Sequence, residues 1–310
     1  MSGVRYNRAP SPELLNILAP GGLLAPMLAP RTVCALALDV QFREKDHVHV
    51  YCGLTRLVDA RLSGRAVIVG ADARYAQQQC GKKLFRAWKL DETGFADALN
   101  EFYDGAVVNP RYTRSEGAVQ ATWAAVRDPW CPIDREGVIG YAKLADQARS
   151  RAFAPVAEAQ HEVARLAGDG VRWTALKPKR TAAELDQLGI DSEGRLVLIE
   201  LKHASASASV YYSPLQLLQY VHEWSAVFDV IRDDLGRIQA ARVALGLLPA
   251  SLRTLGDVIR PVIGFGEQFL IGKAQQRFAA VLEVANRYLP MGAAPIEVWQ
   301  LASGKPRRLP

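Results

Sequence analysis

Residues 196–199, Leu-Val-Leu-Ile, form an uninterrupted apolar run that ends directly in Glu200-Leu201-Lys202. A strand with apolar side chains on both faces has to be covered on both sides, so this run predicts a central, buried strand of a sheet. Glu200 and Lys202 are two residues apart and therefore point to the same face of that strand. Charges at the end of a buried strand are costly unless they are paired or bind a metal ion, which makes this strand end a candidate for chemistry.

A second predicted strand, residues 184–190, is joined to this one by a four-residue turn that begins at Asp191. If the turn is centred between its two middle residues, Asp186 falls opposite Ile199, within one residue of Glu200. The hairpin therefore brings two carboxylates and an amine close together. Two carboxylates with retained water suit Mg²⁺ or Mn²⁺, which can polarise a phosphoryl oxygen.

The order of elements in the C-terminal half predicts a mixed sheet with helices packed on it. Helical patterns cover residues 155–167, residues 213 onward and residues 273–288. Strand patterns cover residues 171–176, 184–190, 195–202, 261–267 and 295–301. This αβββαβαβ order cannot be linked by hairpins alone, so some of the strands must be parallel.

The N-terminal half is expected to be α+β. Its strand and helix patterns fall at residues 34–42, 48–57, 66–69, 93–103 and 115–126. Prolines and Trp130 then interrupt the periodicity, which predicts a linker at residues 127–134. We therefore place a domain boundary near residue 150, with an α+β domain over residues 1–150 and a second domain over residues 151–310.

The composition favours an acidic partner and argues against several classes of protein. Lys and Arg number 38 against 32 Asp and Glu, and the net charge of +6 favours a polyanion such as nucleic acid. The four cysteines lack a C-x-x-C pair, which argues against a zinc site or a disulfide framework. Prolines and glycines interrupt the apolar stretch at residues 14–38, so we expect a cytoplasmic protein without membrane association.

The acids and the lysine of the hairpin resemble a known motif. Asp186, followed on the next strand by Glu200-Leu201-Lys202, is similar to the acidic residue plus E-x-K signature of the PD-(D/E)XK, or restriction-endonuclease-like, nuclease superfamily. The signature has a proline before the first acid, whereas this chain has Leu185 there. That departure leaves Asp191 as an alternative to Asp186, although its place in a turn favours a structural role.

The resemblance covers residues 155–235 well and residues 260–302 loosely. Members of the superfamily have an αβββαβ core, which the predicted order of elements resembles. We therefore expect an α/β fold in which a C-terminal restriction-endonuclease-like αβββαβ core, with a mixed central sheet flanked by helices, follows the α+β N-terminal domain.

Two helices extend the resemblance. In several branches of the superfamily the helix after the E-x-K strand carries Q-x-x-x-Y, and Gln216 and Tyr220 match that spacing. The acidic residue of the family's first helix corresponds to Glu162 or, as the alternative, to Glu158.

The resemblance implies a nuclease that requires Mg²⁺ or Mn²⁺ and hydrolyses phosphodiester bonds, with DNA as the expected substrate in a repair or defence context. The implied catalytic set is Asp186, Glu200, Lys202, Glu162, Gln216 and Tyr220. Within this set, the three acids are the expected metal ligands, and the lysine activates or orients the attacking water.

Several alternatives remain open at this level. The basic residues Lys177, Lys179 and Arg180 beside the hairpin either contact phosphates or form a solvated loop. A catalytically silent nucleic-acid-binding or scaffold protein with the same fold is the competing function, and a structural Glu200–Lys202 pair in an unrelated domain is a third. A homodimer, and a protein partner bound through residues 1–150, are also open.

Overall fold

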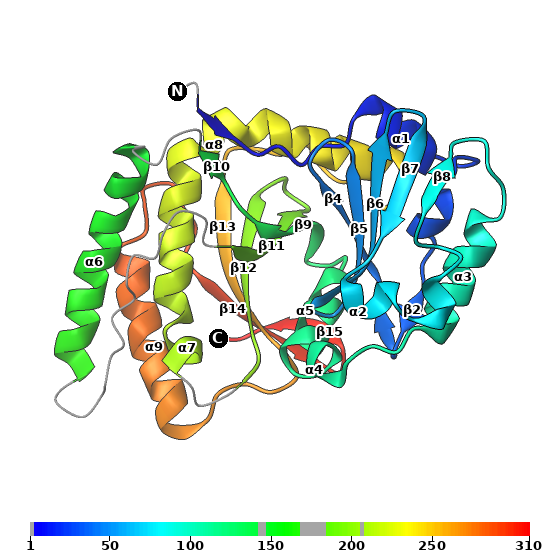
Figure 1. Cartoon of the computed structure of the whole chain (residues 1–310). Helices are drawn as coiled ribbons and strands as arrows, with labels where there is room; N and C mark the ends of the chain where they lie inside the picture. Colours follow the sequence, from blue (N-terminus) through cyan, green and yellow to red (C-terminus); the bar gives the residue numbers. More distant parts are fainter. Residues whose placement is uncertain (1–2, 142–146, 168–183, 205–207) are drawn as a thin grey trace. The chain divides into compact units, whose positions relative to one another are not determined.

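The computed structural model describes residues 3–141, 147–167, 184–204 and 208–310 (Figure 1). The chain divides into two compact units. The mixed-sheet unit comprises residues 1–6, 126–233 and 252–310, and the antiparallel-sheet unit comprises residues 7–125 and 234–251. The division near residue 126 differs from the boundary expected near residue 150, which lies inside helix α6 (Gln147–Ala167).

The mixed-sheet unit is built on a six-stranded sheet in the order β15-β14-β13-β12-β11-β9. Its strands are β9 (Trp130–Gly137), β11 (Leu185–Asp191), β12 (Leu196–Lys202), β13 (Ile259–Phe265), β14 (Glu297–Ala302) and β15 (Lys305–Arg308). The three strands β12, β13 and β14 are parallel, whereas the other pairings are antiparallel. The C-terminal sheet is therefore mixed, as the sequence predicts.

Helices supply the crossover connections that parallel strands require. Helices α7 (Ala208–Tyr211) and α8 (Ser213–Ala244) lie between β12 and β13 in the chain, and α9 (Gly272–Arg287) lies between β13 and β14. Helix α9 contacts both α6 and α7, and it lies between them (Figure 1). A short ladder of β1 (Val4–Arg5) with β10 (Gly140–Tyr141) completes the unit. None of the helices in the described part of the chain is long and apolar enough to cross a lipid bilayer.

Most predicted elements of the C-terminal half are confirmed to within two residues at their ends. The exception is the helix expected at residues 155–167, which begins earlier, at Gln147, with Pro155 inside it. Strand β15 and the short helix α7 were not predicted. The strand expected at residues 171–176 lies outside the described residues, as do Lys177, Lys179 and Arg180.

The predicted linker at residues 127–134 is wrong, because most of it belongs to strand β9. This strand pairs with β11 along most of its length, and Trp130 and Cys131 are buried. Proline is tolerated on edge strands and at bulges, and Pro132 lies on an edge strand beside a bulge. Strand β9 ends the sheet order, and the register shifts beside Gly189, which pairs with Pro132.

The register of the β11–β12 hairpin differs by one residue from the predicted register. Gln187 pairs with Ile199, so one step further along the ladder Asp186 lies across from Glu200 rather than from Ile199. The shift arises because Asp191 pairs with Arg195 around a three-residue loop, with the Asp191 amide donating to the Arg195 carbonyl at 3.2 Å.

Gly194 permits this loop. Its φ is +83°, which favours glycine, and an added Cβ would lie 2.5 Å from the carbonyl oxygen of Thr254. A left-handed glycine at the end of a three-residue loop is a common hairpin connection, and it sets the register that aligns the two carboxylates.

The antiparallel-sheet unit has a five-stranded sheet in the order β4-β5-β6-β7-β8. Its strands are β4 (Asp39–Arg43), β5 (His47–Cys52), β6 (Thr55–Ser63), β7 (Ala66–Gly70) and β8 (Ala87–Lys89), with a separate ladder of β2 (Thr32–Val33) and β3 (Leu36–Ala37). Its α-helices are α1 (Pro12–Leu18), α2 (Ala73–Ala76), α3 (Phe95–Gly105), α4 (Pro110–Thr113) and α5 (Glu116–Ala124), and its 3₁₀ helices are η1 (Ala25–Leu28) and η2 (Gln79–Gly81).

The expected hairpin around residues 43–46 is confirmed by the pairing of Arg43 with His47. The strand predicted at residues 48–57 is wrong as a single element, because the chain turns at Gly53 and pairs back on itself as β5 and β6. An added Cβ at Gly53 would lie 2.0 Å from the carbonyl oxygen of Tyr112, so only glycine fits this turn.

Candidate functional site

Asp186 and Glu200 lie on neighbouring strands of the mixed sheet, at the end of the hairpin away from its turn. The Oδ2 atom of Asp186 accepts a hydrogen bond from the backbone amide of Leu201 at 2.7 Å. This bond holds the Asp186 carboxylate against β12, next to Glu200. Asp186 is half-buried, whereas Glu200 is 1% exposed. The structure therefore brings together the two acids that the sequence predicted as neighbours.

Lys202 lies on the same face of β12 as Glu200. Its Nζ atom donates a hydrogen bond to Oε1 of Glu200, and the side chains of the pair are 15% and 1% exposed. A pair this deeply buried loses far more by removal of one partner than a surface pair does. The lysine therefore neutralises the more buried of the two acids.

Helix α8 presents Gln216 and Tyr220 to the start of β11. The Tyr220 hydroxyl donates to the carbonyl oxygen of Glu184 at 2.9 Å, and Nε2 of Gln216 donates to the Tyr220 hydroxyl at 3.3 Å. Burial and the negative charge of Glu200 raise the pKa of Tyr220, and the charge of Asp186 adds to the effect. The phenol therefore stays protonated and acts as a donor beside the two carboxylates.

Glu223 was not among the predicted residues. It is 6% exposed, and its charge also raises the pKa of Tyr220, which lies three residues earlier on α8. Residues three and four apart on a helix share a face. The sequence signal that could have identified Glu223 is its spacing, because it follows Gln216 and Tyr220 by seven and three residues and therefore shares their helix face.

Glu162 lies in a contact between α6 and α9 rather than with the other acids. Its carboxylate pairs with Arg287 and accepts a hydrogen bond from the Tyr288 hydroxyl at 3.0 Å. Among the described residues these are its partners, so its predicted role as a third metal ligand is not supported. Glu158 is exposed on the same helix, and its charge also acts on Tyr288.

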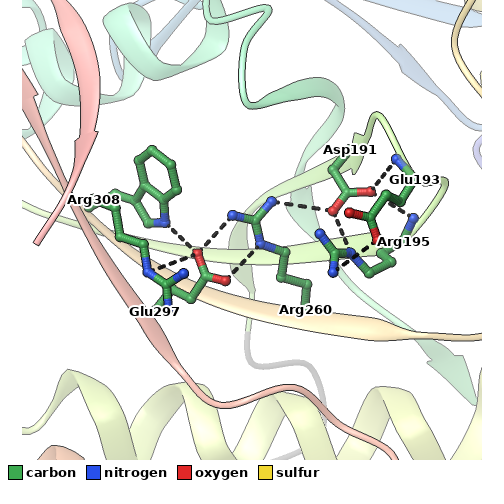
Figure 2. A network of polar contacts seen from close by, with 7 residues as sticks. Asp191, Glu193, Arg195, Arg260, Glu297 and Arg308 are labelled. Atoms are coloured by element: carbon green, nitrogen blue, oxygen red, sulfur yellow. Dashed lines mark hydrogen bonds and ion pairs between the residues drawn. The ribbon is translucent and has the colours of Figure 1, made fainter. Parts of the chain in front are cut away.

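Asp191 has a structural place at the turn end of the hairpin, as the sequence predicts. It is 1% exposed and accepts hydrogen bonds from the backbone amides of Glu193 and Arg195, both at 3.0 Å. Its Oδ2 atom also accepts from the guanidinium groups of Arg195 at 2.7 Å and Arg260 at 3.2 Å (Figure 2). These four hydrogen bonds offset the cost of burying the Asp191 carboxylate.

The polar network of Asp191 continues across the sheet to Glu297. Arg260 donates to both carboxylate oxygens of Glu297, at 3.2 and 2.7 Å, and Trp299 donates to Oε2 at 2.7 Å (Figure 2). Burial by itself would raise the pKa of Glu297, but these hydrogen bonds and the charges of Arg260 and Arg308 outweigh it and lower the pKa. The network therefore joins the hairpin turn to β13, β14 and β15.

The donor set at the open end of the hairpin fits a hard divalent cation. Asp186 and Glu200 supply carboxylate oxygens, which Mg²⁺ and Mn²⁺ prefer, and the half-buried Asp186 leaves room for water ligands. Fold and site together define a mixed α/β protein that gathers two acids, a lysine and a tyrosine at one strand end.

Comparisons of the chain with protein-family models, with curated proteins and with solved structures give no significant match.

Proposed function

We propose that this protein is a divalent-metal-dependent nuclease that hydrolyses phosphodiester bonds in DNA. The observation that supports this proposal is the meeting of Asp186 and Glu200 on paired strands, with Lys202 bonded to Glu200. The order α6, β11, β12, α8, β13 around a mixed sheet supports a restriction-endonuclease-like core.

Each residue has a distinct role in this proposal. Asp186 and Glu200 would hold Mg²⁺ or Mn²⁺, which when bound would lower the pKa of a water ligand and polarise a phosphoryl oxygen. Lys202, with its ammonium group beside Glu200, orients the attacking water and stabilises the negative charge that develops on the phosphate.

Gln216 and Tyr220 act as positioning residues. The hydrogen bond from Tyr220 to the carbonyl of Glu184 holds the start of β11, two residues before Asp186. Gln216 in turn holds the Tyr220 hydroxyl. Loss of either contact loosens the placement of the Asp186 carboxylate, and small displacements of a catalytic group are costly to the rate.

The test is cleavage of labelled single-stranded, duplex and branched DNA, and of RNA, in Mg²⁺, in Mn²⁺ and in EDTA. We expect metal-dependent cleavage of DNA that falls by at least about 100-fold in Asp186→Asn and in Lys202→Met. The matched control is Glu193→Gln, an acid of the same hairpin whose side chain is 63% exposed at the other end. Circular dichroism confirms that each variant is folded.

A further variant, Glu162→Gln, tests whether Glu162 is a metal ligand, as the resemblance implies, or a contact between helices, as the structure has it. Because Glu162 contacts Arg287 and Tyr288, we expect this variant to retain cleavage. If the folded wild type shifts DNA in a gel but yields no product with any metal, the nuclease proposal fails and a silent nucleic-acid-binding protein takes its place.

A further inference from the structure

Three potential metal ligands meet in the antiparallel-sheet unit, whereas Asp186 and Glu200 belong to the mixed-sheet unit. His47 and His49 are two residues apart on β5, so both imidazoles lie on the same face of the sheet. Asp59 pairs with His49 across the β5–β6 ladder and therefore lies on that face too. One ligand atom of each residue lies within 4.8 Å of the other two.

The spacing of these atoms is close to what a single metal ion requires. Ligands bound at about 2.1 Å to a tetrahedral Zn²⁺ lie about 3.4 Å from one another. The Nε2 atom of His49 lies 3.4 Å from Oδ1 of Asp59. His47 and Asp59 are half-buried, so small side-chain rotations can close the remaining separation and leave a position for water.

A hydrogen bond orients the most buried ligand. The Nδ1 atom of His49 lies 3.3 Å from the hydroxyl of Tyr51, and His49 is 7% exposed. When Nδ1 carries the proton and donates to that hydroxyl, the lone pair of Nε2 faces Asp59. Ligating histidines in proteins commonly have their other ring nitrogen held in this way.

We propose that His47, His49 and Asp59 bind one divalent transition-metal ion of the Zn²⁺ class. Imidazole nitrogens suit Zn²⁺, Co²⁺ and Ni²⁺ better than Mg²⁺, so this site differs in its metal from the pair Asp186 and Glu200. The proposal does not depend on the nuclease activity, because the two sets of residues belong to different compact units.

Arg56 is the internal competitor of the metal ion. Its Nη1 atom lies 3.5 Å from Nε2 of His49 and 3.4 Å from Oδ2 of Asp59, and its side chain is 40% exposed. Arg43 and Arg61, which pair with His47 on the adjoining strands, also disfavour a cation. The guanidinium group of Arg56 has to swing outward when the metal binds, so its removal should strengthen binding.

The test is calorimetric titration of the full chain with Zn²⁺, in an Asp186→Asn background that removes one ligand of the other candidate site. We expect one Zn²⁺ per chain, with affinity reduced by more than about 100-fold in His47→Ala and in Asp59→Asn. We expect affinity to rise by about tenfold in Arg56→Met, and Mg²⁺ at millimolar concentration not to compete. The matched control is His161→Ala, an exposed histidine of α6, which should bind as the parent does.

Co²⁺ provides a readout at the ligands themselves, because its visible absorption depends on coordination. The bands should appear in the parent and disappear in His47→Ala. If His47→Ala does not fold, Asp59→Asn, which keeps the size of the side chain, decides the question. Zn²⁺ binding that is absent from the parent, or that persists unchanged in the folded His47 or Asp59 variant, overturns the proposal.

Discussion

The two ends of the β11–β12 hairpin both bury charge, but they balance it differently. At the turn end, Asp191 and Glu297 share Arg260, and Arg195 and Arg308 add further positive charge (Figure 2). At the open end, Glu200 is bonded to Lys202, and Asp186 accepts a hydrogen bond from the backbone amide of Leu201.

The difference in charge balance suggests different roles for the two ends. Carboxylates held by several arginines are typical of structural contacts, whereas two carboxylates gathered at the end of a buried strand suit a metal ion. The turn end should therefore respond to mutation mainly in stability, and the open end should respond to divalent metal.

The largest effect should follow removal of Lys202. In Lys202→Met, the buried Glu200 loses its bonded cation, and removal of one partner of a buried pair costs about 3–5 kcal/mol of unfolding free energy. Because Mg²⁺ or Mn²⁺ can replace the lost charge, millimolar metal should raise the melting temperature of this variant more than that of the wild type. An equal response of the two proteins to metal in a thermal-melting experiment would contradict the metal site at the open end.

A somewhat smaller effect is expected at the turn end. Asp191→Ala removes the acceptor for Arg195, Arg260 and two backbone amides, which should cost about 3 kcal/mol in urea unfolding. The control Glu193→Gln, in the same turn, should change stability by less than about 0.5 kcal/mol. Cleavage per folded molecule should stay at the wild-type level, and a specific loss of kcat in Asp191→Ala would place Asp191 in the catalytic site instead.

The smallest effect is the dependence of the turn-end network on pH. The pKa of Glu297 is lowered in the folded protein, so its stabilising contribution is present above the unfolded pKa and is lost as the pH falls through the folded value. The contribution should be present at pH 7 and should decline as the pH falls below the ordinary pKa range of a glutamate. Urea unfolding of the wild type and Glu297→Gln at several pH values measures it, and a difference between them that is independent of pH would refute this role.

Strand β12 and helix α8 were predictable because their signals are local. The apolar run before Glu200 and the Ser213-Pro214 helix start are properties of adjacent residues, and both elements appear where the sequence places them. Strand β9 was missed for the opposite reason. Pro129 and Pro132 indicate a loop, and only the position of β9 at the sheet edge, with a bulge beside Pro132, makes Pro132 compatible with a strand.

The candidate sites divide in the same way. The sequence identified Asp186, Glu200 and Lys202 because a hairpin relates them directly, with an error of one residue in the register. It misplaced Glu162, whose partner Arg287 lies 125 residues further along the chain. The two histidines at positions 47 and 49 show a strand spacing that puts both on one face, but only the pairing of β5 with β6 adds the carboxylate.

The sequence alone therefore determined the type of the C-terminal elements in the described residues, apart from α7 and β15, and the face on which Glu200 and Lys202 lie. These properties follow from apolar periodicity and from the alternation of side chains along a strand, which need no distant partner. Only the tertiary structure decided the register that aligns Asp186 with Glu200 and the contact of Glu162 with Arg287 instead of with those two acids. It also decided the meeting of His47, His49 and Asp59. Each of these depends on strand pairing or helix contacts between separate segments, whose geometry is set by packing rather than by local sequence.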